Sequence, residues 1–344
     1  MAIELTATGR SIPSRRVTND ELAKRLDTTD EWIRSHTGIG SRHLIDDKTA
    51  CSDLALGAAW DALGQAVEQG LVQEPSAEAL AETLDVIVLG TSSPDYFGAP
   101  ASACIVQHKL GAPHCCAMDI SAGCSGFLYG LETASGLLAV AEGRKRALVI
   151  GADVLSLFID WQDRSTCVLF GDGAAAALLE KTGAPGKGPE KRGIIRTILG
   201  ADGSGEEHLL MRRGGSRNPY HAGERIDLPP HYEMKGQAVY TFAVKTMIEL
   251  IEQLLAEEGI SLDAVKRIVP HQANARIIQA AGKRLNIPEE KFFMNINEYA
   301  NTSAASIPIA LDEMNRNGLL RRGDVIMLIA FGAGLTYGGS LLVW

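Results

Sequence analysis

The sequence has little of what a membrane protein or a nucleic-acid binder needs. No apolar run in its 344 residues approaches the roughly 20 residues of a membrane span, and the N-terminal segment lacks the apolar core of a signal peptide. Basic residues are outnumbered, with 33 Lys and Arg against 42 Asp and Glu and a formal net charge of −9. We therefore expect a cytoplasmic protein whose partners are neither membranes nor nucleic acids.

Motifs for nucleotides and metals are also missing. The glycine-containing stretches 38–42 (GIGSR), 170–174 (FGDGA) and 200–205 (GADGSG) do not form GxGxxG or GxxxxGK[ST]. The six cysteines form no CxxC pair, and no HExxH is present. We therefore expect no cofactor and no metal site, and we interpret the cysteines as reduced thiols.

The sequence does contain enough apolar material for a large core, at 46% hydrophobic residues. Short β-rich runs alternate with longer helical patterns, which is typical of an α/β fold with buried sheets. The clearest predicted strands cover residues 84–90, 146–154, 265–271 and 323–332. The length of the chain indicates one large unit or two fused units.

The same order of predicted elements occurs twice along the chain. We therefore expect two similar α/β halves, residues 1–182 and 183–344, joined through the Gly- and Pro-rich surface stretch 181–193. In this alignment Cys124 occupies the place that Asn301–Ser303 hold in the second half, which predicts that both face a shared seam. The alternative is a coincidence between two generic α/β patterns.

The segment DISAGCSGFLYG (119–130) places Cys124 between an apolar strand and a helical pattern. The free N–H groups and the dipole of a helix N-terminus stabilise a thiolate, and flanking glycines allow a substrate to approach closely. Most cysteines are small buried hydrophobic residues, but this junction favours a nucleophile. By itself the motif also fits a hydrolase elbow in which cysteine replaces serine.

His271 is the histidine best placed to assist a nucleophile. It follows a predicted strand and precedes a helical pattern, where α/β folds build sites; a core histidine is the alternative. Asn301 can offer its amide to a substrate oxygen, whereas we interpret Thr302 and Ser303 as helix caps. The turn FGAG (331–334) is either a tight hairpin or a source of exposed N–H donors.

Several long segments resemble β-ketoacyl-acyl carrier protein synthase III, within the thiolase superfamily. They are DISAGCSGFLYG, VPHQANARII, NTSAASIP, FGAGLTYG, TTDEWIRSHTGIGSRH and FGDGAAA, and the similarity covers essentially the whole chain. The resemblance implies a five-layered αβαβα thiolase fold of two similar halves, usually a homodimer. It also implies an acyltransferase that condenses an acyl-CoA primer, acetyl-CoA or similar, with malonyl-acyl carrier protein, which initiates fatty acid biosynthesis.

The same resemblance implies a catalytic triad of Cys124, His271 and Asn301, with an oxyanion hole formed by the backbone N–H groups of Cys124 and Ala333. Chain-elongating relatives use Cys-His-His instead, and thiolases use a second cysteine near the C-terminus, whereas the predicted second half here has none. Chalcone synthase-like enzymes share the triad, but the segment 28–43 and the chain length favour the bacterial synthase III type.

The resemblance further implies coenzyme A contacts. They fall on Trp32, His36, Arg164 and Asn274. His36 stands where the family often has arginine, so this part of the contact can become pH-dependent.

Carrier-protein docking is implied for Arg276, Lys283 and Arg284, which share one face of a predicted helix. An ordinary solvated helix face is the alternative reading of these cations. A further docking lysine of the family is replaced by Thr241, with Lys245 one turn later as a substitute.

Ala99 stands where acetyl-specific relatives often carry a bulky residue, which implies a larger acyl pocket, completed in the family by the partner subunit. We therefore expect primers beyond acetyl to be accepted.

Three functions stay open from the sequence. The first is the synthase III reaction, either in fatty acid biosynthesis or at the start of a specialised lipid, quinolone or polyketide pathway. The second is a cysteine hydrolase or acyltransferase that works without decarboxylation. The third is a noncatalytic module that binds acyl-CoA or carrier protein.

Overall fold

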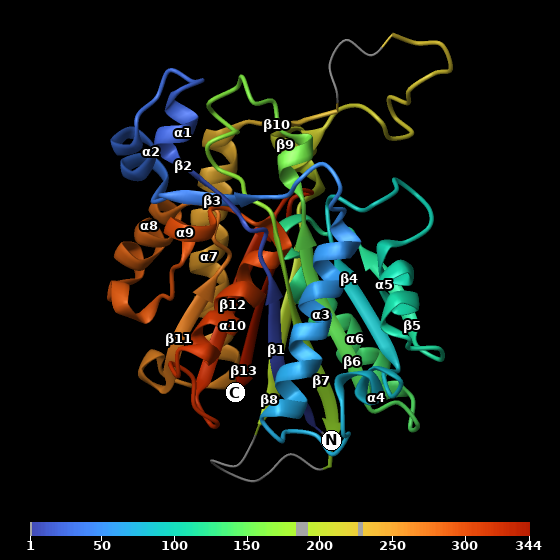
Figure 1. Cartoon of the computed structure of the whole chain (residues 1–344). Coiled ribbons are helices and arrows are strands. Elements are labelled where there is room, and N and C mark those ends of the chain that lie inside the picture. Colours follow the sequence, from blue (N-terminus) through green and yellow to red (C-terminus); the bar gives the residue numbers. More distant parts are fainter. Residues whose placement is uncertain (1, 184–191, 226–229) are drawn as a thin grey trace.

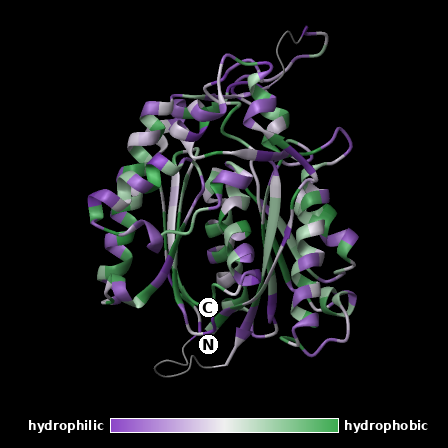
Figure 2. Ribbon diagram, turned by 60° about the vertical axis from the view of Figure 1, so that its left-hand side comes forward, coloured by the Kyte–Doolittle hydropathy of each residue, from purple (hydrophilic) through white to green (hydrophobic). Residues whose placement is uncertain are grey.

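The computed structural model describes residues 2–183, 192–225 and 230–344. Two β-sheets alternate with three layers of helices, so that Figure 2 shows helices on both outer sides and in the middle between the sheets. This arrangement confirms the predicted five-layered αβαβα fold. No described helix is both long and apolar enough to cross a membrane.

The first sheet has five strands in the order β1-β7-β6-β4-β5 (Figure 1). β4 runs parallel to β5 and β6, and β7 runs antiparallel to β6 and β1. The bounds are β1 Ala2–Ser11, β4 Val86–Gly90, β5 Cys116–Ile120, β6 Arg146–Asp153 and β7 Gly173–Thr182. β4 reads as a continuous apolar run because helices cover both faces of this sheet.

The second sheet has the order β11-β12-β13-β8, with β11 and β12 parallel and the other pairs antiparallel. Its strands are β8 Gly193–Ala201, β11 Val265–Pro270, β12 Val325–Gly332 and β13 Thr336–Val343. Two small ribbons lie at the top of Figure 1: β2 Arg15–Thr18 with β3 Ser41–Leu44, and β9 Leu209–Met211 with β10 Tyr232–Met234.

The middle layer consists of α6 Gly126–Val140 and α10 Ser306–Arg316. Their apolar side chains join those of both sheets in one core, which includes Phe127, Leu131 and Ile307. α3 Cys51–Glu68, α4 Ala77–Ala81 and α5 Ser102–Leu110 cover the outer face of the first sheet. α7 Gly236–Glu258 and α8 Ala275–Leu285 cover the second.

Three short helices, α1 Asn19–Ala23, α2 Asp30–Thr37 and α9 Ile296–Tyr299, complete the described α-helices. A fully buried arginine, Arg42 on β3, ties the α1–α2 region to the pocket described below. Its guanidinium donates to Asn19 Oδ1 at 2.7 Å and to the Val168 carbonyl at 2.8 Å. Burial lowers the pKa of Arg42 to about 10.

The division of the chain at residues 182 and 183 stays a prediction. β7 ends at Thr182 and β8 begins at Gly193. The middle of the predicted connection 181–193, residues 184–191, lies outside the described residues.

Candidate active site

Cys124 lies in a 3-10 turn, Gly123–Ser125, between the end of β5 and the start of α6. The turn packs backbone to backbone against the end of β12. A Cβ atom on Gly332 would lie 2.5 Å from the Cys124 nitrogen, and one on Gly123 would lie 2.7 Å from the Ala333 nitrogen. Gly123 also has φ +53°, so the glycine at this position serves both the turn and the close approach.

The buried surroundings of Cys124 keep its thiol protonated. Burial raises the pKa of the thiol to about 12, a hydrogen bond from the Ser303 hydroxyl to Sγ at 3.3 Å opposes the rise, and the Asp153 carboxylate adds to it. This differs from the thiolate expected at a helix N-terminus, because desolvation of the sulfur outweighs the hydrogen bond. The proton therefore has to leave when the sulfur reacts.

His271 directly follows β11, and both its backbone and its imidazole ring form contacts that fix its position. Its N–H donates to the Ile329 carbonyl at 2.7 Å, and its ring packs edge-on against Phe331. Nδ1 lies 2.7 Å from Ser306 Oγ, which also accepts a hydrogen bond from the Gln272 N–H at 3.3 Å. This network favours the tautomer with the proton on Nε2, and burial keeps the ring neutral by lowering the pKa to about 3.

Asn301 is buried with its side chain oriented by the turn that follows it. Its Oδ1 accepts a hydrogen bond from the Ser303 N–H at 2.8 Å. Its backbone donates to the Leu169 carbonyl at 2.9 Å and accepts from Gly171 at 3.0 Å. Because the side-chain oxygen is engaged, the amide N–H groups are the part left to contact a ligand.

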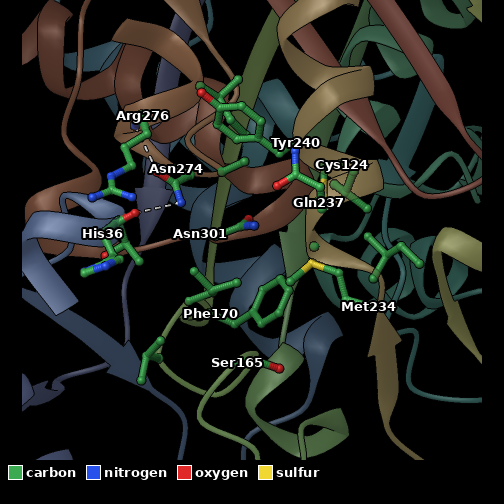
Figure 3. Close-up of a pocket in the computed structure, with 18 of the residues that line it drawn as sticks. His36, Cys124, Ser165, Phe170, Met234, Gln237, Tyr240, Asn274, Arg276 and Asn301 are labelled. Carbon is green, nitrogen blue, oxygen red and sulfur yellow. Dashed lines mark hydrogen bonds between the residues drawn. The ribbon is translucent and has the colours of Figure 1, made fainter. Parts of the chain in front are cut away.

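A pocket of about 460 Å³ brings these residues together. Its lining includes eight residues that the sequence predicted: Trp32, His36, Cys124, Arg164, His271, Asn274, Arg276 and Asn301. They come from α2, the turn before α6, the segment before β7, the segment between β11 and α8, α8 itself and the turn before α10. Figure 3 shows Gln237 and Tyr240 of α7 on the other side of the opening, with Phe170 and Met234 below them.

The rings at the pocket mouth are stacked. The Arg164 guanidinium carbon lies 5.0 Å from the centre of the Trp32 ring, and Arg164 also donates to the Asp27 carbonyl at 2.5 Å. His36 stacks on Trp32 with ring centroids 4.3 Å apart. The indole therefore has both a guanidinium and an imidazole packed against its ring.

Asn274 caps α8, because its Oδ1 accepts the Arg276 N–H at 2.9 Å. Its amide also donates to the His36 carbonyl at 3.1 Å (Figure 3). Arg276 Nε donates to the Ser35 carbonyl at 3.0 Å. These bonds fasten α8 to α2 across the pocket mouth.

Other predicted residues lie away from this pocket. Lys283 and Arg284 are exposed in the last turn of α8. Ala99 is exposed and does not line the pocket. Ala333 packs against the Cys124 turn but does not line the pocket either. Thr241 and Lys245 line a neighbouring hollow. That hollow shares Gly236, Gln237 and Phe242 with the pocket.

The interpretation of Thr302 and Ser303 as caps is wrong. Neither side chain caps a helix here; Ser303 takes φ +53°, and its hydroxyl turns toward Cys124. The sequence signal that pointed to Ser303 was its place opposite Cys124 in the two aligned halves. Ser306 lies within the segment NTSAASIP but was given no role from the sequence, and no motif indicated the α7 residues of the pocket wall.

Known proteins are similar over the whole chain. The family model of 3-oxoacyl-[acyl-carrier-protein (ACP)] synthase III matches residues 118–203. A second model, of the C-terminal part of the same family, matches residues 255–344. The β-ketoacyl-[acyl-carrier-protein] synthase III of Clostridium acetobutylicum is 41% identical over 100% of this chain and 99% of its own. The β-ketoacyl-[acyl-carrier-protein] synthase III of Syntrophomonas wolfei is 44% identical over 100% of this chain and 98% of its own. A crystal structure of 3-oxoacyl-[acyl-carrier-protein] synthase III from Aquifex aeolicus matches with a TM-score of 0.85 at 39% identity, covering 99% of this chain and 100% of that one.

Proposed function

The chain belongs to the β-ketoacyl-[acyl-carrier-protein] synthase III family, and from that premise we propose that Cys124, His271 and Asn301 carry out its reaction. The enzyme is an acyltransferase that condenses an acyl-CoA primer with malonyl-acyl carrier protein and so initiates fatty acid biosynthesis. The observation that carries the assignment is that the three side chains, from three separate segments, line one pocket.

In the first half-reaction the Cys124 sulfur attacks the thioester carbon of the primer, and coenzyme A leaves. The carbonyl oxygen becomes negatively charged in the tetrahedral intermediate. The backbone N–H groups of Cys124 and Ala333 would hold this oxyanion, and the close packing of Gly123 against the Ala333 nitrogen supports that arrangement.

In the second half-reaction malonyl-carrier protein loses CO2 and an enolate forms. The Nε2–H of a neutral His271 and the amide N–H of Asn301 donate to the thioester oxygen on which this charge develops. The low pKa of His271 and the engaged Oδ1 of Asn301 support donor roles for both. The carbanion then attacks the acyl group on Cys124 and releases a 3-oxoacyl-carrier protein.

For substrate binding, coenzyme A would stack its adenine on Trp32 beside Arg164, with His36 and Asn274 along the same wall. Arg276, Lys283 and Arg284 would dock the acidic carrier protein, since all three are exposed on α8 and Arg276 lies at the pocket mouth. Lys245 is a further candidate for this contact.

The working unit is proposed to be a cytoplasmic homodimer in which Ala99 of one subunit completes the acyl pocket of the other. Tyr96 and Phe97, close to Ala99 in the chain, are 56% and 58% exposed, which supports burial of this loop against a second copy. All six cysteines are free, as expected in a reducing compartment.

The test is to incubate the protein with acetyl-CoA and malonyl-carrier protein and to measure CO2 release and the mass of the Cys124 peptide. We expect an acetyl group on Cys124 and release of CO2, both lost in Cys124→Ala. Cys104→Ala, which removes an exposed thiol, is the matched control. Acylation without CO2 release would contradict the condensation, and absence of any acylation would favour a binding module.

A further inference from the structure

The Thr336 hydroxyl joins the two turns that supply the oxyanion hole in the proposed function. Thr336 is the first residue of β13, after the turn that follows β12. Its Oγ1 lies 2.7 Å from the carbonyl oxygen of Ala122, which precedes the Cys124 turn, and 3.1 Å from that of Ala333. The single hydroxyl proton is therefore shared between two carbonyl groups in a three-centre hydrogen bond.

These two carbonyl groups belong to the chain on either side of the proposed hole. The Ala122 carbonyl also accepts the Ser125 N–H at 3.1 Å and so closes the turn that carries the Cys124 N–H. The Ala333 carbonyl belongs to the residue whose N–H is the second proposed donor. Among the described residues no hydrogen bond engages that N–H, which leaves it able to bind a ligand oxygen. The Thr336 hydroxyl thus fixes the two turns relative to each other.

The backbone of Thr336 is held independently of its hydroxyl. Thr336 pairs with Gly332 of β12 on one side and with Ala201 of β8 on the other. The preceding residue, Leu335, exchanges two backbone hydrogen bonds with Asp202, at 2.8 and 3.0 Å. Because the main chain is anchored in this way, the hydroxyl contributes one thing only, which is the link from the sheet to the two turns.

We propose that Thr336 is a positioning residue that keeps the backbone N–H groups of Cys124 and Ala333 aligned for the oxyanion. When Sγ bonds to the thioester carbon of acyl-CoA, the carbonyl electron pair moves to the oxygen, and it returns when the bond to the coenzyme A sulfur breaks. Donors that already face this oxygen need no reorganisation, so their alignment affects the rate of the step. This inference rests on the proposed oxyanion hole and on the proposed acylation of Cys124.

The test compares three variants with the unaltered protein. Thr336→Val keeps nearly the shape of the side chain and suits a strand, but it has no hydroxyl to donate, whereas Thr336→Ser keeps the hydroxyl. Thr197→Val is the matched control, because it removes a hydroxyl from β8 of the same sheet, one that lies 3.3 Å from Ser340 Oγ.

Two reactions of the same sulfur are measured. The first is single-turnover acetyl transfer from acetyl-CoA to Cys124, followed by mass at several acetyl-CoA concentrations. The second is alkylation of Cys124 by iodoacetamide at the same pH. Alkylation displaces iodide from a saturated carbon and forms no oxyanion, so it reports the access and reactivity of the thiol alone.

We expect Thr336→Val to lower the maximal rate of acetyl transfer about 10- to 100-fold, since a displaced donor loses stabilisation of the transition state. The acetyl-CoA concentration at half-maximal rate and the rate of alkylation should stay at the values of the unaltered protein. Thr336→Ser should recover most of the acetyl-transfer rate, and Thr197→Val should match the unaltered protein in both assays.

Unchanged acetyl transfer in Thr336→Val would overturn this role of Thr336 while leaving the proposed function intact. An equal fall in the alkylation rate would also overturn it, because the substitution would then have moved the thiol itself. A serine variant as slow as the valine variant would show that the hydroxyl is not responsible. If the unaltered protein is alkylated at Cys124 but takes no acetyl group from acetyl-CoA, the proposed function fails together with the role of Thr336.

Discussion

His271 Nδ1 and Ser306 Oγ lie 2.7 Å apart in the buried layer between the two sheets. The serine fixes the ring orientation and the tautomer from the side away from the pocket. Ser306→Ala should therefore leave a buried nitrogen without its partner, at a cost of about 1–3 kcal/mol. We expect kcat for malonyl-carrier protein decarboxylation to fall while acetylation of Cys124 continues at its usual rate. Ser135→Ala, which removes a hydroxyl that bonds to the Leu131 carbonyl within α6, is the control. An equal loss in both half-reactions would contradict a role of Ser306 through His271.

The contact between the Cys124 turn and Gly332 leaves no room for a side chain. Gly332→Ala would place a Cβ 2.5 Å from the Cys124 nitrogen and so displace the turn. We expect loss of acetylation at Cys124 in a protein that still folds, as measured by mass and by circular dichroism. Gly136→Ala in α6 meets open space and should stabilise the helix by about 0.5–1 kcal/mol with full activity.

Burial of neutral His271 makes stability depend on pH. Its pKa is about 3 in the folded protein, against an ordinary value of 6.5. Between these values the unfolded chain binds more protons, so this residue lowers the free energy of unfolding as pH falls, by up to about 1.4 kcal/mol per pH unit. His271→Asn should flatten the pH dependence of urea denaturation in this window, relative to the parent and to His108→Asn. An unchanged slope would contradict a neutral buried imidazole.

Trp32 should contribute to coenzyme A affinity more than to chemistry. Stacking of a base on an aromatic ring is worth about 1–3 kcal/mol, so Trp32→Ala should raise KM for acetyl-CoA. kcat should stay close to that of the parent, because the ring lies at the pocket mouth. Trp161→Ala, whose ring does not line the pocket, serves as the control in steady-state kinetics. A fall in kcat with constant KM would argue against adenine stacking here.

The range of acyl-CoA primers that the enzyme accepts tests whether the small side chain of Ala99 enlarges the acyl pocket. We expect rates with isobutyryl- and hexanoyl-CoA to be comparable to the rate with acetyl-CoA, and Ala99→Phe to restrict the enzyme to acetyl-CoA. Since Ala99 is exposed on its own chain, this effect depends on a dimer. Strict acetyl preference in the parent would contradict the prediction, and a monomer in light scattering would remove its basis.

The fold class and several of the pocket residues could be predicted from the amino-acid sequence. Continuous apolar runs and the helical patterns between them are local properties of the chain, and they predicted an α/β fold with buried sheets. The five layers were implied by the family resemblance. Cys124, His271 and Asn301 each lie just after a recognisable strand or within an unusual motif, which is why spacing and resemblance found them.

The ionisation and orientation of these groups follow from tertiary packing and could not be predicted from the sequence. Desolvation of Cys124 depends on what packs around it, so the predicted thiolate is a thiol in the folded protein. Ser303 looked like a cap because serine commonly ends turns before helices, but its positive φ directs the hydroxyl to the sulfur. Burial likewise raises the pKa of the Asp153 carboxyl, which follows from what packs around the end of β6. Burial and backbone angle arise from the whole packed chain, and no local pattern of residues specifies them.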